Sequence, residues 1–128
     1  MKTNDNKFWF FAGRELGEIM DDLKEALQLP QFIGENEDSW EWFEPETPDG
    51  DFYFNMAREH NREHGRYECP IILDIRNDQS FVLEDIGECI ATTLNIDVYY
   101  GLVYYFNGEE YKYKPKKIFK KPGNEKQL

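Results

Sequence analysis

The sequence of 128 residues has only two cysteines, Cys69 and Cys89, and no long apolar run. Two cysteines cannot build the disulfide framework that stabilises small secreted domains, so we expect reduced thiols in a cytoplasmic protein. No stretch approaches the roughly 18 apolar residues that a membrane-spanning helix needs. The short apolar run at residues 8–12 lacks the features of a signal peptide. We therefore expect no membrane role.

Nucleotide-binding motifs are also absent. The chain contains neither G-x-x-x-x-G-K-[ST] nor G-x-G-x-x-G, the glycine-rich patterns whose backbone N–H groups hold phosphates. We expect no cofactor.

Positive charge is scarce. Lys and Arg number 15 against 26 Asp and Glu, which gives a formal net charge of −11. Such a surface repels phosphate backbones, so direct binding of nucleic acid is disfavoured. It attracts a basic protein, and charge steering of this kind accelerates association.

The length predicts one domain with a single core. We expect a single α+β domain over residues 1–114 and a Lys-rich tail over residues 115–128. From Lys112 onward the sequence contains seven Lys and one acid, Glu125. Such a tail is typical of a flexible end or of a segment that folds back on an acidic surface.

Hydrophobic periodicity predicts eight elements in the order β-α-β-β-β-α-β-β. Alternating or continuous apolar runs indicate strands, and apolar residues at i, i+3, i+4 and i+7 indicate amphipathic helices. The expected strands are 7–12, 39–43, 52–57, 70–76, 97–106 and 109–113, and the expected helices are 14–29 and 80–94. Gly87 would let the second helix approach the sheet closely, and Asn95 would end it. This order fits one mainly antiparallel sheet with two helices packed on one face.

Residues 35–51 form the most unusual stretch, with eight acids, no base and the aromatic residues Trp40, Trp42 and Phe43. Protein interfaces favour large aromatic anchors, and carboxylates around them can pair with Lys and Arg of a partner. We expect a partner-binding site made of Asp38, Trp40, Glu41, Trp42, Phe43, Glu44, Glu46, Asp49 and Asp51. Rings on one side of a strand are also what an ordinary core requires. Six tyrosines on the final hairpin raise the same question, because strand alternation cannot bury all of them.

His60, Glu63 and His64 match the pattern H-x-x-E-H, in which two histidines hold Zn²⁺ and the glutamate acts as a base. The chain has no third histidine, so another ligand would have to be a distant carboxylate or Cys69. A nucleophilic Cys69 paired with His64 would lack an orienting group. A solvated polar segment is the ordinary alternative, and we expect the protein not to be an enzyme.

Three features carry a resemblance to a known family: the size of the chain, its mixed order of helices and strands, and the acidic aromatic segment Asp38-Ser39-Trp40-Glu41-Trp42-Phe43-Glu44. In these features the chain resembles the immunity proteins of bacterial polymorphic toxin and contact-dependent growth inhibition systems. The resemblance implies a cytoplasmic protein that binds and neutralises one cognate basic toxin domain, often a nuclease. Two alternatives remain open at this point. One is a phage or mobile-element protein that mimics DNA charge, and the other is a small zinc-dependent hydrolase that uses His60, Glu63 and His64.

Overall fold

The computed structural model describes residues 6–37, 40–46, 52–59, 66–77, 83–106 and 110–122. These residues form seven strands, two α-helices and a short 3₁₀ turn at Arg66–Glu68. The strands are β1 (Asn6–Phe10), β2 (Phe32–Glu37), β3 (Trp40–Pro45), β4 (Phe52–Glu59), β5 (Ile71–Asn77), β6 (Val98–Phe106) and β7 (Glu110–Phe119), and the helices are α1 (Leu16–Leu27) and α2 (Leu83–Leu94).

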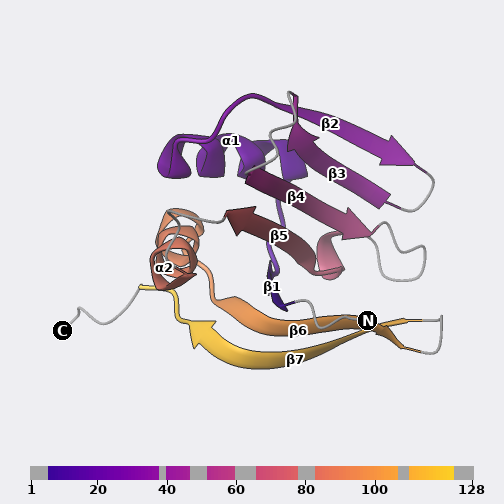
Figure 1. Cartoon of the computed structure of the whole chain (residues 1–128), viewed down its shortest axis with the longest axis vertical. Coiled ribbons are helices and arrows are strands. Elements are labelled where there is room, and N and C mark those ends of the chain that lie inside the picture. The colour runs from indigo at the N-terminus through magenta and orange to yellow at the C-terminus, as the bar shows by residue number, and fades with distance from the viewer. Residues whose placement is uncertain are drawn as a thin grey trace.

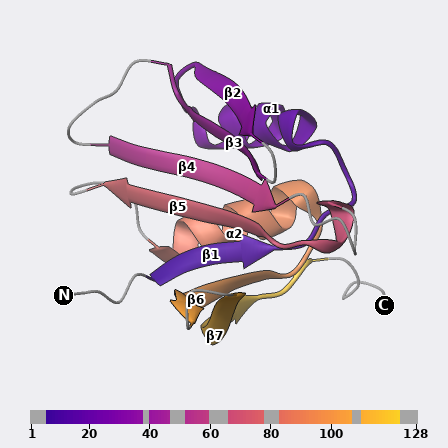
Figure 2. The same ribbon diagram turned by 90° about the vertical axis from the view of Figure 1, so that its right-hand side faces the viewer.

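The seven strands form one sheet in the order β2-β3-β4-β5-β1-β6-β7, and every neighbouring pair is antiparallel. Both helices lie on the same side of this sheet, as Figure 1 and Figure 2 show. The α+β class is therefore confirmed. We call the side without helices the uncovered face.

The predicted order is wrong by one strand, because β2 was not expected. Only Phe32 in this strand is partly buried, and the other five residues are exposed. A strand at the edge of a sheet with so little burial produces no alternation of apolar and polar residues. The sequence gives no local signal for it.

The main core lies between the sheet and the two helices. The buried face of α1 consists of Leu16, Ile19, Met20 and Leu23, as the apolar spacing predicted. Asn95 adopts a left-handed conformation with φ of 56°, and the Ile96 N–H donates to Ala91 O at 3.2 Å, so the predicted end of the second helix is confirmed. Neither helix in the described part of the chain is long and apolar enough to cross a bilayer.

The final strand is longer than predicted. The expected end at Tyr113 is wrong: β7 continues to Phe119 and remains paired with β6, so residues 115–119 of the Lys-rich segment belong to the sheet. Phe119 is only 5% exposed and joins the main core. A Cβ atom at Gly87 would overlap the Phe119 ring, which confirms that this glycine lets α2 approach the sheet closely.

Candidate protein-binding face

Strand alternation divides the predicted site between the two faces of the sheet. Phe43 packs against the main core, and its ring is 3.7 Å from where a Cβ of Gly17 would lie. Trp40 and Trp42 point to the opposite, uncovered face, because neighbouring residues of a strand alternate. Phe43 therefore packs against the core, and of these three rings only the two tryptophans lie on the uncovered face.

Glu41 shares the covered side with Phe43. Its carboxylate lies 3.1 Å from Nε of Arg58, and the side chain is 14% exposed. Arg58 itself is fully buried and donates to the carbonyl oxygens of Ala12 and Arg14 at 3.0 and 2.8 Å. The Arg58 guanidinium also lies over the Tyr67 ring, 5.1 Å from its centroid. The expectation that Glu41 pairs with a partner does not fit this geometry, because the carboxylate compensates a buried cation.

The other predicted residues have different positions. Glu44 lies on the same face as Trp42, two residues away along β3. Glu46 is exposed, and its backbone N–H donates to Gln31 O at 2.9 Å, just past the end of β3. Asp38, Asp49 and Asp51 lie outside the described residues, as do His60, Glu63 and His64.

Register brings carboxylates from the two neighbouring strands beside the tryptophans. Trp42 is opposite Glu35 of β2 and Ala57 of β4. Trp40 is opposite Glu37 of β2 and Glu59 of β4. Directly opposed residues project on the same face with their Cβ atoms about 5 Å apart. Each tryptophan is therefore bordered by at least one carboxylate.

We define the acidic aromatic patch as this set together with Ile33, which is opposite Glu44 and is 43% exposed. Its members are Ile33, Glu35, Glu37, Trp40, Trp42, Glu44 and Glu59. The three strands that carry it contain a single cation, Arg58, which belongs to the covered side. The patch thus presents four carboxylates and no basic residue. Glu35, Glu37 and Glu59 were not predicted, and only the pairing of β2 and β4 with β3 could have identified them.

The centre of the uncovered face is filled by a second cluster of aromatic and aliphatic side chains. Trp9, Ile72 and Val103 are buried there, with Trp40, Tyr99 and Tyr113 packed against them. The Trp9 ring stacks on Tyr99 with centroids 5.7 Å apart, and Tyr113 covers it at 5.1 Å. Burial raises the pKa of Tyr113 above its ordinary range, and the nearby charge of Glu59 contributes less.

The sheet coils around this second cluster. The rings of Trp40 and Tyr111 meet with centroids 5.9 Å apart, although β4, β5, β1 and β6 separate their strands in the sheet. Tyr111 remains 40% exposed, so the prediction that some tyrosines of the final hairpin are exposed is confirmed. Trp40 is therefore held in place by its neighbours in the second cluster, whereas Trp42 is not among the described residues of that cluster.

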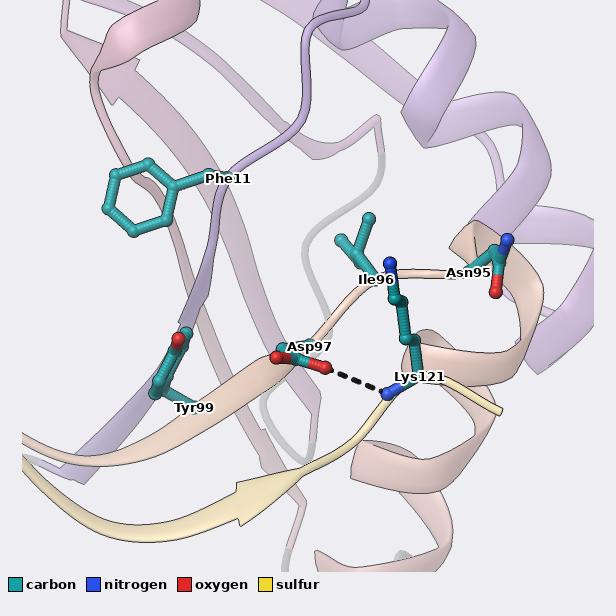
Figure 3. A pocket seen from close by; sticks show the side chains of 6 residues that line it. All are labelled: Phe11, Asn95, Ile96, Asp97, Tyr99 and Lys121. Atoms are coloured by element: carbon teal, nitrogen blue, oxygen red, sulfur yellow. Dashed lines mark hydrogen bonds between the residues drawn. The ribbon is translucent and has the colours of Figure 1, made fainter. Parts of the chain in front are cut away.

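A shallow hollow of about 240 Å³ lies where β1 ends and β6 begins (Figure 3). Phe11, Ile96 and Tyr99 form its apolar wall. Asp97 accepts hydrogen bonds from the backbone N–H of Lys121 at 2.9 Å and from Lys120 Nζ at 3.1 Å. The backbone bond, with Lys120 as the second cause, lowers the pKa of Asp97. The carboxylate thus holds the chain that follows β7 against the start of β6.

Neither a metal site nor a similarity to known proteins assigns a function to this chain. Among the described residues, no group of three or more His, Cys, Asp and Glu side chains is arranged to hold a metal ion. No protein-family model, curated protein or solved structure matches the chain. A function can therefore be inferred only from the chemistry of the surface.

Proposed function

We propose that this protein is a non-enzymatic inhibitor that acts in the cytoplasm by covering the basic surface of a toxin domain, as an immunity protein does. The acidic aromatic patch makes the contact. Trp42 is the central anchor, and Glu35, Glu37, Glu44 and Glu59 pair with Lys and Arg of the toxin. Glu46 lies beside the patch and adds to its charge.

The observation that carries this proposal is the arrangement of carboxylates around two tryptophans on the uncovered face. Glu35, Trp42 and Ala57 form one row across β2, β3 and β4, and Glu37, Trp40 and Glu59 form the next. Tryptophan is enriched among residues that dominate binding energy, and polar groups around such anchors exclude water from the contact. A nuclease, whose cleft must be basic to hold a phosphate backbone, offers the complementary surface.

The charge distribution favours this function over mimicry of DNA. Within the sheet, acids collect on β2, β3 and β4, whereas β7 at the other end of the strand order carries Lys112, Lys114, Lys116 and Lys117. A DNA mimic needs carboxylates distributed along a surface in the way that phosphates follow a duplex. A local patch on a protein with one basic edge is better suited to one protein partner.

The test begins with capture of a basic partner from a lysate of the source organism, with the protein as bait at low and then moderate salt. The captured partner is purified, and its affinity is measured for the wild type, for Trp42→Ala and for Ile118→Ala. Ile118 is 47% exposed on β7 and provides a control of exposed apolar surface outside the patch. Truncating a hot-spot aromatic residue costs about 2 kcal/mol or more, which is roughly a thirtyfold loss of affinity.

A thirtyfold loss for Trp42→Ala with little change for Ile118→Ala supports the proposal. Equal affinity of all three proteins contradicts the placement of the interface. Failure to retain any basic protein contradicts the proposed class of function. Circular dichroism of each variant confirms that the fold is retained.

A further inference from the structure

Strand β2 is an edge of the sheet, and no strand of the described chain pairs with its outer side. Five of its six residues are exposed. An edge strand presents a row of N–H and C=O groups that can pair with another chain.

The direction of these groups follows from one hydrogen bond. The Glu46 N–H donates to Gln31 O at 2.9 Å, and these two residues are opposite each other by continuation of the register from Phe32 and Pro45. In an antiparallel ladder, hydrogen-bonded and non-hydrogen-bonded pairs alternate. Ile33, Glu35 and Glu37 therefore turn their backbone groups toward β3. Phe32, Gly34 and Asn36 turn theirs toward the open edge.

The two edges of the sheet differ in their protection against pairing. The other edge strand, β7, has four lysines, Pro115 and a register shift at Tyr100/Gly101. Lysine, proline and bulges on an edge are features by which proteins block unwanted strand addition. Strand β2 has no lysine, no proline and no shift in its pairing with β3. The lack of such features leaves β2 accessible to an added strand.

We propose that β2 binds an extended basic segment of the partner as an eighth strand of the sheet. This inference rests on the proposed function and specifies how the partner is engaged. The added strand hydrogen-bonds to the backbone of Phe32, Gly34 and Asn36. On the uncovered face, every second side chain of that strand is Lys or Arg and lies beside Glu35 or Glu37.

A second copy of this chain is a poorer occupant. Pairing of β2 with β2 of another copy brings Glu35 and Glu37 of both chains together, and like charges opposite each other destabilise a sheet. Pairing of β2 with β7 of another copy meets Pro115, which cannot donate a hydrogen bond. The observations therefore favour a different, basic chain.

The probe is a seven-residue synthetic peptide of alternating Lys and Val. Its matched control has the same sequence and charge, with N-methyl groups on every second residue so that one edge cannot donate hydrogen bonds. Binding of the first peptide is expected to slow hydrogen exchange of the Gly34 and Asn36 amides, measured by NMR on the full chain. The N-methylated peptide is expected to bind at least about tenfold more weakly, because it loses several backbone hydrogen bonds.

Two variants at one position separate edge pairing from loss of a side chain. Asn36→Pro removes the N–H that faces the open edge, whereas Asn36→Ala retains it. Proline is tolerated on an edge strand where its nitrogen faces solvent. Asn36→Pro is expected to lose at least about tenfold in affinity for the Lys and Val peptide, and Asn36→Ala is expected to bind as the wild type does.

Peptide binding without slower exchange at Gly34 and Asn36, or equal binding of the N-methylated peptide, overturns strand addition. The same holds if Asn36→Pro binds as the wild type does, if neither peptide binds, or if sedimentation shows self-association that Asn36→Pro abolishes. None of these results affects the Trp42→Ala test with the purified partner. Strand addition and the proposed function can therefore fail separately.

Discussion

The guanidinium of Arg58 lies 3.1 Å from the carboxylate of Glu41, which is its directly opposed neighbour on β3. Arg58 has no exposed surface, and it also contacts the carbonyl oxygens of Ala12 and Arg14 and the ring of Tyr67. One ion pair thus joins two strands to the loop that precedes α1. It also removes one of the predicted interface acids from the surface.

Arg58→Ala is expected to destabilise the fold by about 3–5 kcal/mol, because it breaks a largely buried ion pair with Glu41 and removes the hydrogen bonds donated to the carbonyl oxygens of Ala12 and Arg14. Glu41→Gln keeps an acceptor for the guanidinium, so it is expected to cost less, about 1–3 kcal/mol. Urea denaturation of both variants measures these free energies of unfolding. A loss below about 1 kcal/mol for Arg58→Ala would show that the pair contributes little.

The contact between Gly87 and Phe119 gives a second stability prediction. A methyl group at Gly87 meets the ring of Phe119, so Gly87→Ala is expected to cost about 1–3 kcal/mol through overpacking. Phe119→Ala is expected to cost about 3–5 kcal/mol through the cavity that it creates. In the double variant the penalty of Gly87→Ala should largely disappear. Additive penalties in this double-mutant cycle would argue against direct contact.

The buried Tyr113 should make the free energy of unfolding depend on pH in the alkaline range. Burial raises its pKa in the folded state above the unfolded value of about 10, so the folded state holds this proton more tightly. The stabilisation is present in full below pH 10 and is lost as pH rises beyond it. The wild type should lose stability above pH 10 more steeply than Tyr113→Phe. Equal slopes for the two proteins in denaturation at pH 9 to 11 would contradict this prediction.

Zinc content separates the inhibitor from the hydrolase that the H-x-x-E-H match suggests. If the protein acts by binding alone, His60 and His64 have no catalytic role. Protein purified without a His tag is then expected to contain no stoichiometric zinc, as measured by inductively coupled plasma mass spectrometry. His60→Ala together with His64→Ala should leave partner affinity unchanged. One zinc ion per chain that is lost in this double variant would instead support the hydrolase alternative.

The sequence predicted those elements in which burial produces a regular spacing of apolar residues. The sequence correctly predicted the apolar face of α1, the left-handed end of α2 at Asn95 and the apolar β5. Each of these patterns reflects the local environment of the residues that form it. Strand β2 was missed because its neighbours bury almost none of it. The length of β7 was missed because exposed lysines alternate with few apolar residues until Phe119, which contacts a helix distant in sequence.

The candidate site shows the same limit. The segment around Trp40 and Trp42 was recognisable, since acids and rings without a base are unusual in any chain. The role of each residue was not recognisable, because it depends on the face to which the strand turns it. Phe43 and Glu41 belong to the covered side, and Glu35, Glu37 and Glu59 come to the tryptophans only through strand pairing.

The most direct test of the central claim compares two variants with the same change in net charge. Glu35→Lys, Glu37→Lys and Glu44→Lys together reverse the patch. Asp21→Lys, Glu25→Lys and Glu88→Lys together reverse exposed acids on the two helices. The affinity of each triple variant for the purified partner is measured over a range of salt concentrations, with the wild type as reference.

If the acidic aromatic patch is the binding site, the patch variant should lose affinity by at least about tenfold. Its affinity should also depend less on salt, because its charge pairs with the partner are gone. The helix variant should change affinity by less than about threefold, since long-range charge effects are screened. Equal losses in the two variants, or no loss in either, would contradict the claim that the uncovered face of β2, β3 and β4 binds the partner.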